Sequence, residues 1–129
     1  MIAHVQTPDG LAVVDLDDET VLELDPAREL DPAPQPSVSL PRLVAAAAAG
    51  STIVAVVDAK PPLMVSHDAS RTWRDSGRGL PAGRAVAVSA DDPDVILYAA
   101  RNRLYLSRDG GRFWSGLAPE LPEITAVAL

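Results

Sequence analysis

The chain has no cysteine and very few aromatic residues. Its 129 residues include two tryptophans, two tyrosines and one phenylalanine. Without cysteine there is no disulfide and no thiolate metal ligand, so neither a disulfide framework nor a cysteine-based zinc site explains the fold. The chain is nevertheless long enough for one hydrophobic core, and a hydrophobic content of 47% predicts a folded protein.

Positive charge is also scarce. Eleven Lys and Arg stand against 18 Asp and Glu, which gives a formal net charge of −7. Phosphate contacts need clustered Lys and Arg, so this balance argues against nucleic acid or an anionic membrane as a partner. No stretch approaches the length of a membrane span, and no secretory apolar run follows Met1. We therefore expect a cytoplasmic protein, or a secreted one if the sequence is a piece of a longer chain.

Two stretches of the sequence are nearly the same, 41 residues apart. The segment LMVSHDASRTW at 63–73 returns as LYLSRDGGRFW at 104–114. A gapless alignment of residues 43–81 with 84–122 has 11 identities in 39 pairs. The same offset continues into 125–129 and extends back, more weakly, to 2–25. A fixed period near 40 residues predicts a repeat architecture.

Each repeat unit is expected to contain four short strands. In the third unit they are predicted at about 85–90, 95–101, 103–107 and 112–117, separated by turn residues. The alanine run at 45–49 has helical propensity, but its shortness and its match to a Val/Ala alternation predict a strand. The chain divides into a divergent first unit with a Pro-rich connection (1–42), a second unit (43–83), a third unit (84–124) and the first strand of a further unit (125–129).

Both clear repeats carry the pattern Ser-x-Asp-x-small-x-x-Trp at a tight turn between the third and fourth strands. Its members are Ser66, Asp68, Trp73, Ser107, Asp109, Gly111 and Trp114. Ser and Asp side chains bond nearby backbone, Gly supplies a positive φ, and Trp buries a ring whose N–H is available to a carbonyl. We interpret the pattern as a structural clip. In the first unit Asp25–Arg28 stands where Ser-x-Asp is expected, and Pro32 where Trp is expected.

The pattern resembles the Asp-box, or BNR repeat, Ser-x-Asp-x-Gly-x-Thr-Trp. Ser70 departs from it at the Gly position and Phe113 at the Thr position, while Asp92-Pro93 before a strand resembles the phrase that commonly precedes such boxes. The resemblance covers 43–129 well and 2–25 loosely. It implies an all-β chain of about three four-stranded β-propeller blades with peripheral boxes. The family includes sialidases, xyloglucan-active glycosidases, sortilin-type receptors and photosystem II assembly factors, so blades alone do not name a function.

The sequence offers no recognisable catalytic set. Tyr98 and Tyr105 fall at apolar strand positions, which predicts core packing rather than a sialidase-like nucleophile. Glycoside hydrolysis needs two carboxylates across one sugar, and nothing pairs Asp15, Asp58 or Glu123. Asp15 and Asp58 align at equivalent strand positions, where exposure to solvent is the favoured interpretation.

Metal-binding signals are similarly weak. The acidic residues at 15–19 lack EF-hand spacing and predict a solvated turn rather than a calcium site. His4 and His67 have no partner at metal-ligand spacing. No cofactor and no metal are therefore expected.

Three blades are too few to close a propeller, which typically has about 4–8. The open ends are association sites by default. Two copies closing a six-bladed ring, a second propeller-fragment chain, and truncation from a longer propeller remain as alternatives, with the homodimer preferred. In that dimer the strand at 125–129 is expected to pair with a blade of the other chain.

The expected function is a non-enzymatic scaffold or binding protein that assembles into a larger ring. The alternative is a glycosidase- or sialidase-like enzyme, active only after assembly or as part of a longer chain. The candidate site for a small-molecule or carbohydrate ligand is the central mouth, formed by the loops at 91–94 and 60–62.

Overall fold

The computed structural model describes residues 1–31 and 33–129, and every regular element in them is a β-strand. The strands are β1 (Ile2–Thr7), β2 (Gly10–Asp15), β3 (Thr20–Asp25), β4 (Leu43–Ala49), β5 (Thr52–Val57), β6 (Leu63–Ser66), β7 (Arg74–Ser76), β8 (Gly83–Val88), β9 (Ile96–Ala100), β10 (Arg103–Ser107), β11 (Ser115–Glu120) and β12 (Ala126–Ala128). They form three four-stranded antiparallel sheets, so the prediction of an all-β chain of about three blades is confirmed.

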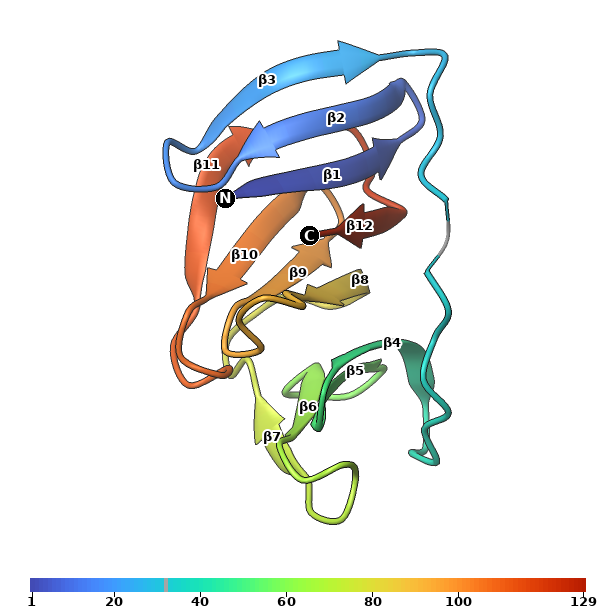
Figure 1. Cartoon of the computed structure of the whole chain (residues 1–129), viewed down its shortest axis with the longest axis vertical. Coiled ribbons are helices and arrows are strands. Elements are labelled where there is room, and N and C mark those ends of the chain that lie inside the picture. The colour runs from blue at the N-terminus through green and yellow to red at the C-terminus, as the bar shows by residue number, and fades with distance from the viewer. Residues whose placement is uncertain (32) are drawn as a thin grey trace.

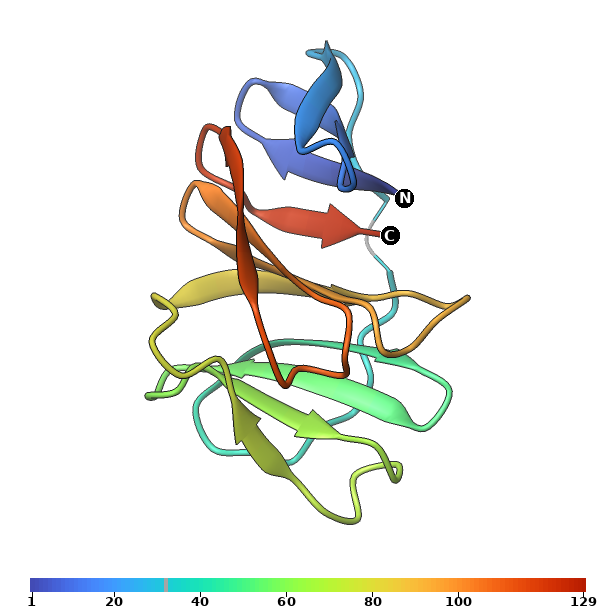
Figure 2. The ribbon, with the colours of Figure 1, turned by 90° about the vertical axis from the view of Figure 1, so that its left-hand side faces the viewer.

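We name the sheets by their strands. Sheet A has the order β12-β1-β2-β3, sheet B the order β4-β5-β6-β7, and sheet C the order β8-β9-β10-β11. Sheet C lies between the other two (Figure 1), and the turned view shows the three stacked as separate layers (Figure 2). This is an incomplete, three-bladed propeller-like arrangement.

Two hydrophobic clusters hold the stack together, one on each face of sheet C. Strand alternation sends one set of side chains of sheet C toward sheet A and the other toward sheet B. Between A and C lie mainly Ala3, Val5, Ala12, Val14, Leu16, Ala85, Ala87, Leu97, Ala99, Leu104, Leu106, Leu117 and Ile124. Between B and C lie Ala45, Val54, Val56, Leu63, Val65, Val86, Ile96 and Tyr98. No described strand of sheet A contacts a strand of sheet B.

The alanine run at 45–49 forms most of β4, as predicted. The side chains along β4 alternate between the two faces of sheet B, and Ala45 packs in the cluster shared with sheet C. The small side chains suit an inner strand that lies close to its neighbours. The predicted strands of the third unit also form, but β11 begins at Ser115 rather than at 112, because the turn motif extends through Trp114.

Strand β12 corrects one expectation. It pairs with β1 of the same chain, with Val5 opposite Val127, and Thr125 donates its backbone N–H to the Gln6 carbonyl at 3.0 Å. The segment 125–129 therefore supplies the first strand of sheet A rather than of a further blade. On the side that faces β1, its backbone groups are therefore paired within the chain, while its other side is an edge of sheet A.

The gapless alignment is a second expectation that the structure corrects. Equivalent positions after the shared bulge are Ala45 and Ala85 in the first strands but Val56 and Ala99 in the second, which are offsets of 40 and 43. The β8–β9 loop is longer than the β4–β5 turn, and the β9–β10 turn is shorter than the β5–β6 loop, so the two differences in length nearly cancel. The offset of 41 thus holds for the third strands and the turn motifs, but it does not hold for the first and second strands.

The first unit is displaced by one whole strand. β1 and β2 are the second and third strands of sheet A, so the turn between third and fourth strands is 16–19. The predicted motif position Asp25–Arg28 instead begins at the last residue of the fourth strand, β3. Pro32, the expected replacement for Trp, lies outside the described residues.

The Pro-rich connection runs from β3, beside the inner strands, to β4 (Figure 1). Apart from Pro32, none of its residues 26–42 belongs to a strand. Pro36, Val38 and Leu40 are half-buried while the residues between them are exposed. This alternation indicates an extended segment with one side against the protein.

Candidate functional site

The first turn motif, motif B (residues 66–73), is closed by its own side chains. Ser66 Oγ donates to Asp68 Oδ1 at 2.9 Å and accepts the Ser70 backbone N–H at 2.9 Å. The other end is held by Thr72, whose backbone N–H bonds Asp68 Oδ1 at 2.9 Å and whose hydroxyl bonds Oδ2 at 2.5 Å. The Thr72 hydroxyl and N–H, followed by Ser66, lower the pKa of Asp68 to about 2. Asp68 therefore remains ionised as the hub of the turn.

Motif C (residues 107–114) repeats this geometry. Ser107 Oγ donates to Asp109 Oδ1 at 2.9 Å and accepts the Gly111 N–H at 2.9 Å, while the Phe113 N–H reaches Asp109 Oδ1 at 3.0 Å. That Phe113 N–H is the main cause of the lowered pKa of Asp109. Phe113 supplies no hydroxyl, and its side chain is 78% exposed. The Ser and Asp part of the predicted clip is thus present in both repeats.

Motif C also binds the neighbouring sheet, which the sequence did not predict. Ser76 of sheet B donates its hydroxyl to the Gly111 carbonyl and accepts the Trp114 Nε1–H at 3.0 Å. The same indole N–H lies 3.2 Å from the Gly111 carbonyl, and the Trp114 ring meets Tyr98 edge-on at 6.2 Å between centroids. His67 Nε2 lies 3.3 Å from the Gly110 carbonyl. The motif therefore joins sheets B and C.

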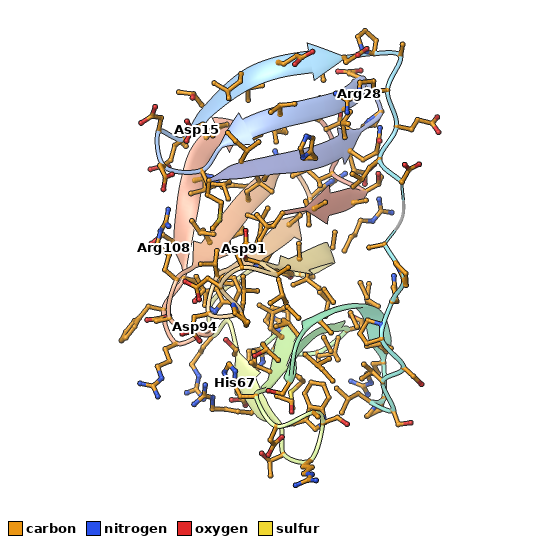
Figure 3. The ribbon with its side chains drawn as sticks, in the orientation of Figure 1. Asp15, Arg28, His67, Asp91, Asp94 and Arg108 are labelled. Atoms are coloured by element: carbon orange, nitrogen blue, oxygen red, sulfur yellow. The ribbon has the colours of Figure 1, made fainter. Side chains whose placement is uncertain are left out.

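A similar contact joins sheets C and A. Arg108, the variable residue between Ser107 and Asp109, donates from Nη2 to Asp17 Oδ1 at 2.7 Å (Figure 3). The terminal amine of Met1 bonds the other oxygen at 2.5 Å and, with Arg108, lowers the pKa of Asp17. Glu19 accepts the Ala118 N–H at 2.7 Å.

The variable motif residue therefore reaches the next sheet at both junctions. His67 does so from sheet B to C, and Arg108 from sheet C to A. A tight-turn pattern read along the chain gives no sign of this role. The signal in the sequence is that both residues are polar, although the pattern allows any residue at this position.

The predicted central mouth is not one surface. The loop at 91–94 joins the first and second strands of its sheet and lies beside motif C, where the Asp94 carbonyl accepts the Gly110 N–H at 2.9 Å. The loop at 60–62 joins second and third strands, so it lies at the opposite end. There Lys60 and Pro61 line an open pocket of about 520 Å³ with residues 75 and 78–80.

A different hollow follows the inner strands. It has a volume of about 260 Å³ and lies between the Pro-rich connection and β4, β8 and β12. Its lining includes residues 30, 31, 33–35, 45–48, 84–88 and 125–129. Most of the strand residues in it are Ala or Val, so its walls are small and apolar. We call it the inner groove.

The tyrosines are structural. Tyr98 is fully buried, and its hydroxyl donates to the Pro81 carbonyl at 2.8 Å. Burial, with a smaller contribution from Tyr105, raises the pKa of Tyr98 to about 12. Tyr105 packs on the same cluster, 6.3 Å away between ring centroids. The core-packing interpretation of both residues is confirmed.

The carboxylates considered for hydrolysis lie apart in the fold. Asp15 ends the third strand of sheet A and accepts the Asp17 and Asp18 N–H groups at 2.9 and 3.1 Å. Asp58 follows the second strand of sheet B, so the expected equivalence with Asp15 is wrong. Glu123 pairs with Arg84 at 3.4 Å. The structure brings no two of the three candidates together.

Metal binding and membrane insertion would each need a specific arrangement of residues. Within residues 1–31 and 33–129, no group of three or more His, Asp or Glu side chains is placed to hold a metal ion. The same part of the chain has no helix that is long and apolar enough to cross a membrane.

Comparison of the chain with protein-family models, with curated proteins and with solved structures finds no match.

Proposed function

We propose that the chain is a non-enzymatic β-propeller scaffold or binding module of the Asp-box type, which assembles into a larger ring. The observation that carries this proposal is the use of both turn motifs. The polar groups that both motifs share are engaged in closing the turns, and motif C also joins its sheet to the next. Such groups build a framework for stacked blades, and their hydrogen-bonding capacity is largely consumed in doing so.

Assembly is supported by the two sheets at the ends of the stack. Sheets A and B each pack against sheet C on one face, and the other face meets no further sheet. Seven of the eight exposed large apolar side chains belong to these end sheets or to the chain terminus beside them: Met1, Ile2, Val21, Leu22, Leu24, Leu43 and Val44. Apolar side chains that remain exposed on both end sheets favour interaction surfaces there.

The ligand-binding role rests on the inner groove. A volume of about 260 Å³ lies just below the range of about 300–1,000 Å³ typical of small-molecule sites. Further blades would extend the same wall of inner strands around a channel. We therefore assign a small-molecule or carbohydrate ligand to the channel of the assembled ring.

Sedimentation velocity of the chain at micromolar concentration tests the proposal. We expect a species heavier than one chain. Ile2→Ser, next to Ala3 and therefore on the face of sheet A away from sheet C, should shift the distribution toward the single chain. Phe113→Ser removes a more exposed apolar side chain from the middle sheet and should leave the distribution unchanged. A single chain that melts cooperatively at every concentration would overturn the proposal.

A further inference from the structure

The junction between sheets B and C shows how one sheet receives the next. Ser76 lies opposite Leu63, a third-strand residue whose side chain packs toward sheet C. The Ser76 side chain is buried, and it accepts the indole N–H of Trp114 from motif C. An acceptor on the fourth strand of one sheet thus meets the tryptophan of the following sheet.

Sheet A carries an acceptor at the corresponding place. Asp25 lies on the fourth strand opposite Leu11, as Ser76 lies opposite Leu63. Because Ala12 and Val14 pack toward sheet C, alternation turns Leu11 and Asp25 to the face that no sheet covers. Leu11 is itself buried, and the Leu30 N–H bonds Gln6 Oε1 beside it at 2.7 Å, so the start of the Pro-rich connection covers this part of the face. Asp25 Oδ1 accepts the Ala27 N–H at 2.9 Å. Its other oxygen has no hydrogen-bond partner among the described residues.

Sheet B carries the matching donor. Trp73 occupies in motif B the place that Trp114 occupies in motif C, so the repeat puts it on the side of sheet B away from sheet C. Its indole N–H has no acceptor in the described part of the chain, and its side chain is half-buried. The Pro-rich connection meets sheet B at β4 and leaves β6 and β7, at the other edge, uncovered (Figure 1).

Charge favours the same pairing. Residues 1–25 contain seven Asp and Glu and no Lys or Arg. Residues 60–78 of sheet B contain four cations against two acidic residues. Arg74 lies opposite Val65 and so faces sheet C, which leaves Lys60, Arg71 and Arg78 outside that junction. Opposite potentials on two surfaces attract and orient them, whereas two copies of sheet A would repel each other.

Resting on the assembly proposed above, we infer that the free face of sheet A is the docking surface for sheet B of a second copy, with Trp73 of one copy donating its indole N–H to Asp25 of the other. Two such junctions related by a two-fold axis close a ring of six sheets. Each junction repeats the geometry that joins sheets B and C within the chain.

The dissociation constant of the dimer, measured by sedimentation equilibrium, tests this contact. Trp73→Phe and Asp25→Ala should each weaken the dimer about a hundredfold, because each removes a hydrogen bond to a charged group from both junctions of the ring, at about tenfold for each bond. The double variant should be no weaker than either single variant. Asp25→Ser, which installs the side chain of position 76, should retain the dimer. Trp114→Phe, the matched control, should leave the dimer constant unchanged.

The outcomes separate the contact from the assembly. If the wild-type chain self-associates and both Trp73→Phe and Asp25→Ala associate equally well, the contact is wrong and the scaffold proposal stands. Open assemblies larger than a dimer would refute the closed ring. A wild type that stays a single chain at every concentration would overturn both proposals.

Discussion

Replacing Trp114 by alanine tests whether motif C joins two sheets or only closes a turn. A tryptophan side chain buries roughly 150 Å² or more, worth about 4 kcal/mol at about 25 cal/mol per Å². The ring of Trp114 is partly exposed, which lowers this value, and its edge-on contact with Tyr98 adds about 1 kcal/mol. We therefore expect Trp114→Ala to lower the free energy of unfolding by about 3 kcal/mol.

Urea denaturation followed by far-ultraviolet circular dichroism measures this loss. Trp114→Phe keeps most of the apolar area and removes the N–H that reaches Ser76, so about 1 kcal/mol should be lost. Phe113→Ala truncates the adjacent ring, which is 78% exposed, and should change stability by less than about 0.5 kcal/mol. If Trp114→Ala cost less than about 1 kcal/mol, motif C would not couple the sheets.

Four further substitutions probe the two turn motifs and strand β8. Ser70 holds a φ of +70°, so Ser70→Gly should stabilise the chain by about 1 kcal/mol, whereas Gly111→Ala, at a φ of +89°, should destabilise it by at least that amount in urea titrations. Thr72→Val should raise the pKa of Asp68 from about 2 toward 3.8 in an NMR titration. The stability that this carboxylate confers is present above pH 3.8 and is lost as the pH falls through its folded pKa. Because the folded pKa is higher in the variant, the variant should lose this stability at a higher pH. Gly83→Ala would put a Cβ 2.4 Å from a buried tyrosine ring and should cost about 3 kcal/mol by the same denaturation assay.

The fold class could be predicted from the sequence because the patterns that determine it are local. Alternating apolar residues and turn chemistry determine each hairpin, and the repeated Ser, Asp and Trp mark the same turn twice. Even the alanine run was predictable, since its match to a Val/Ala alternation outweighed helical propensity. The interpretation of Tyr98 as a core residue followed from the same alternation.

Connections between sheets were harder to predict. The alignment of residues 2–25 is off by one strand because loop lengths can change while the apolar alternation survives. The pairing of β12 with β1 joins residues more than 100 positions apart, and no local pattern encodes it. The bond from Arg108 to Asp17 likewise depends on which sheets become neighbours. The mouth proposed from loops 60–62 and 91–94 failed for the same reason.

The loss of the motif from sheet A has a physical account. A tryptophan there would dock on the preceding sheet, C, as Trp114 docks on sheet B. Sheet A meets sheet C through other groups: Asp17 bonds Arg108, and Glu19 accepts the Ala118 N–H. Asp15 meanwhile bonds the turn's own N–H groups, as the motif serines and aspartates do elsewhere. Carboxylates have thus taken over both tasks of the motif, closing the turn and reaching the neighbouring sheet. The acidity of residues 1–25 follows in part from this exchange.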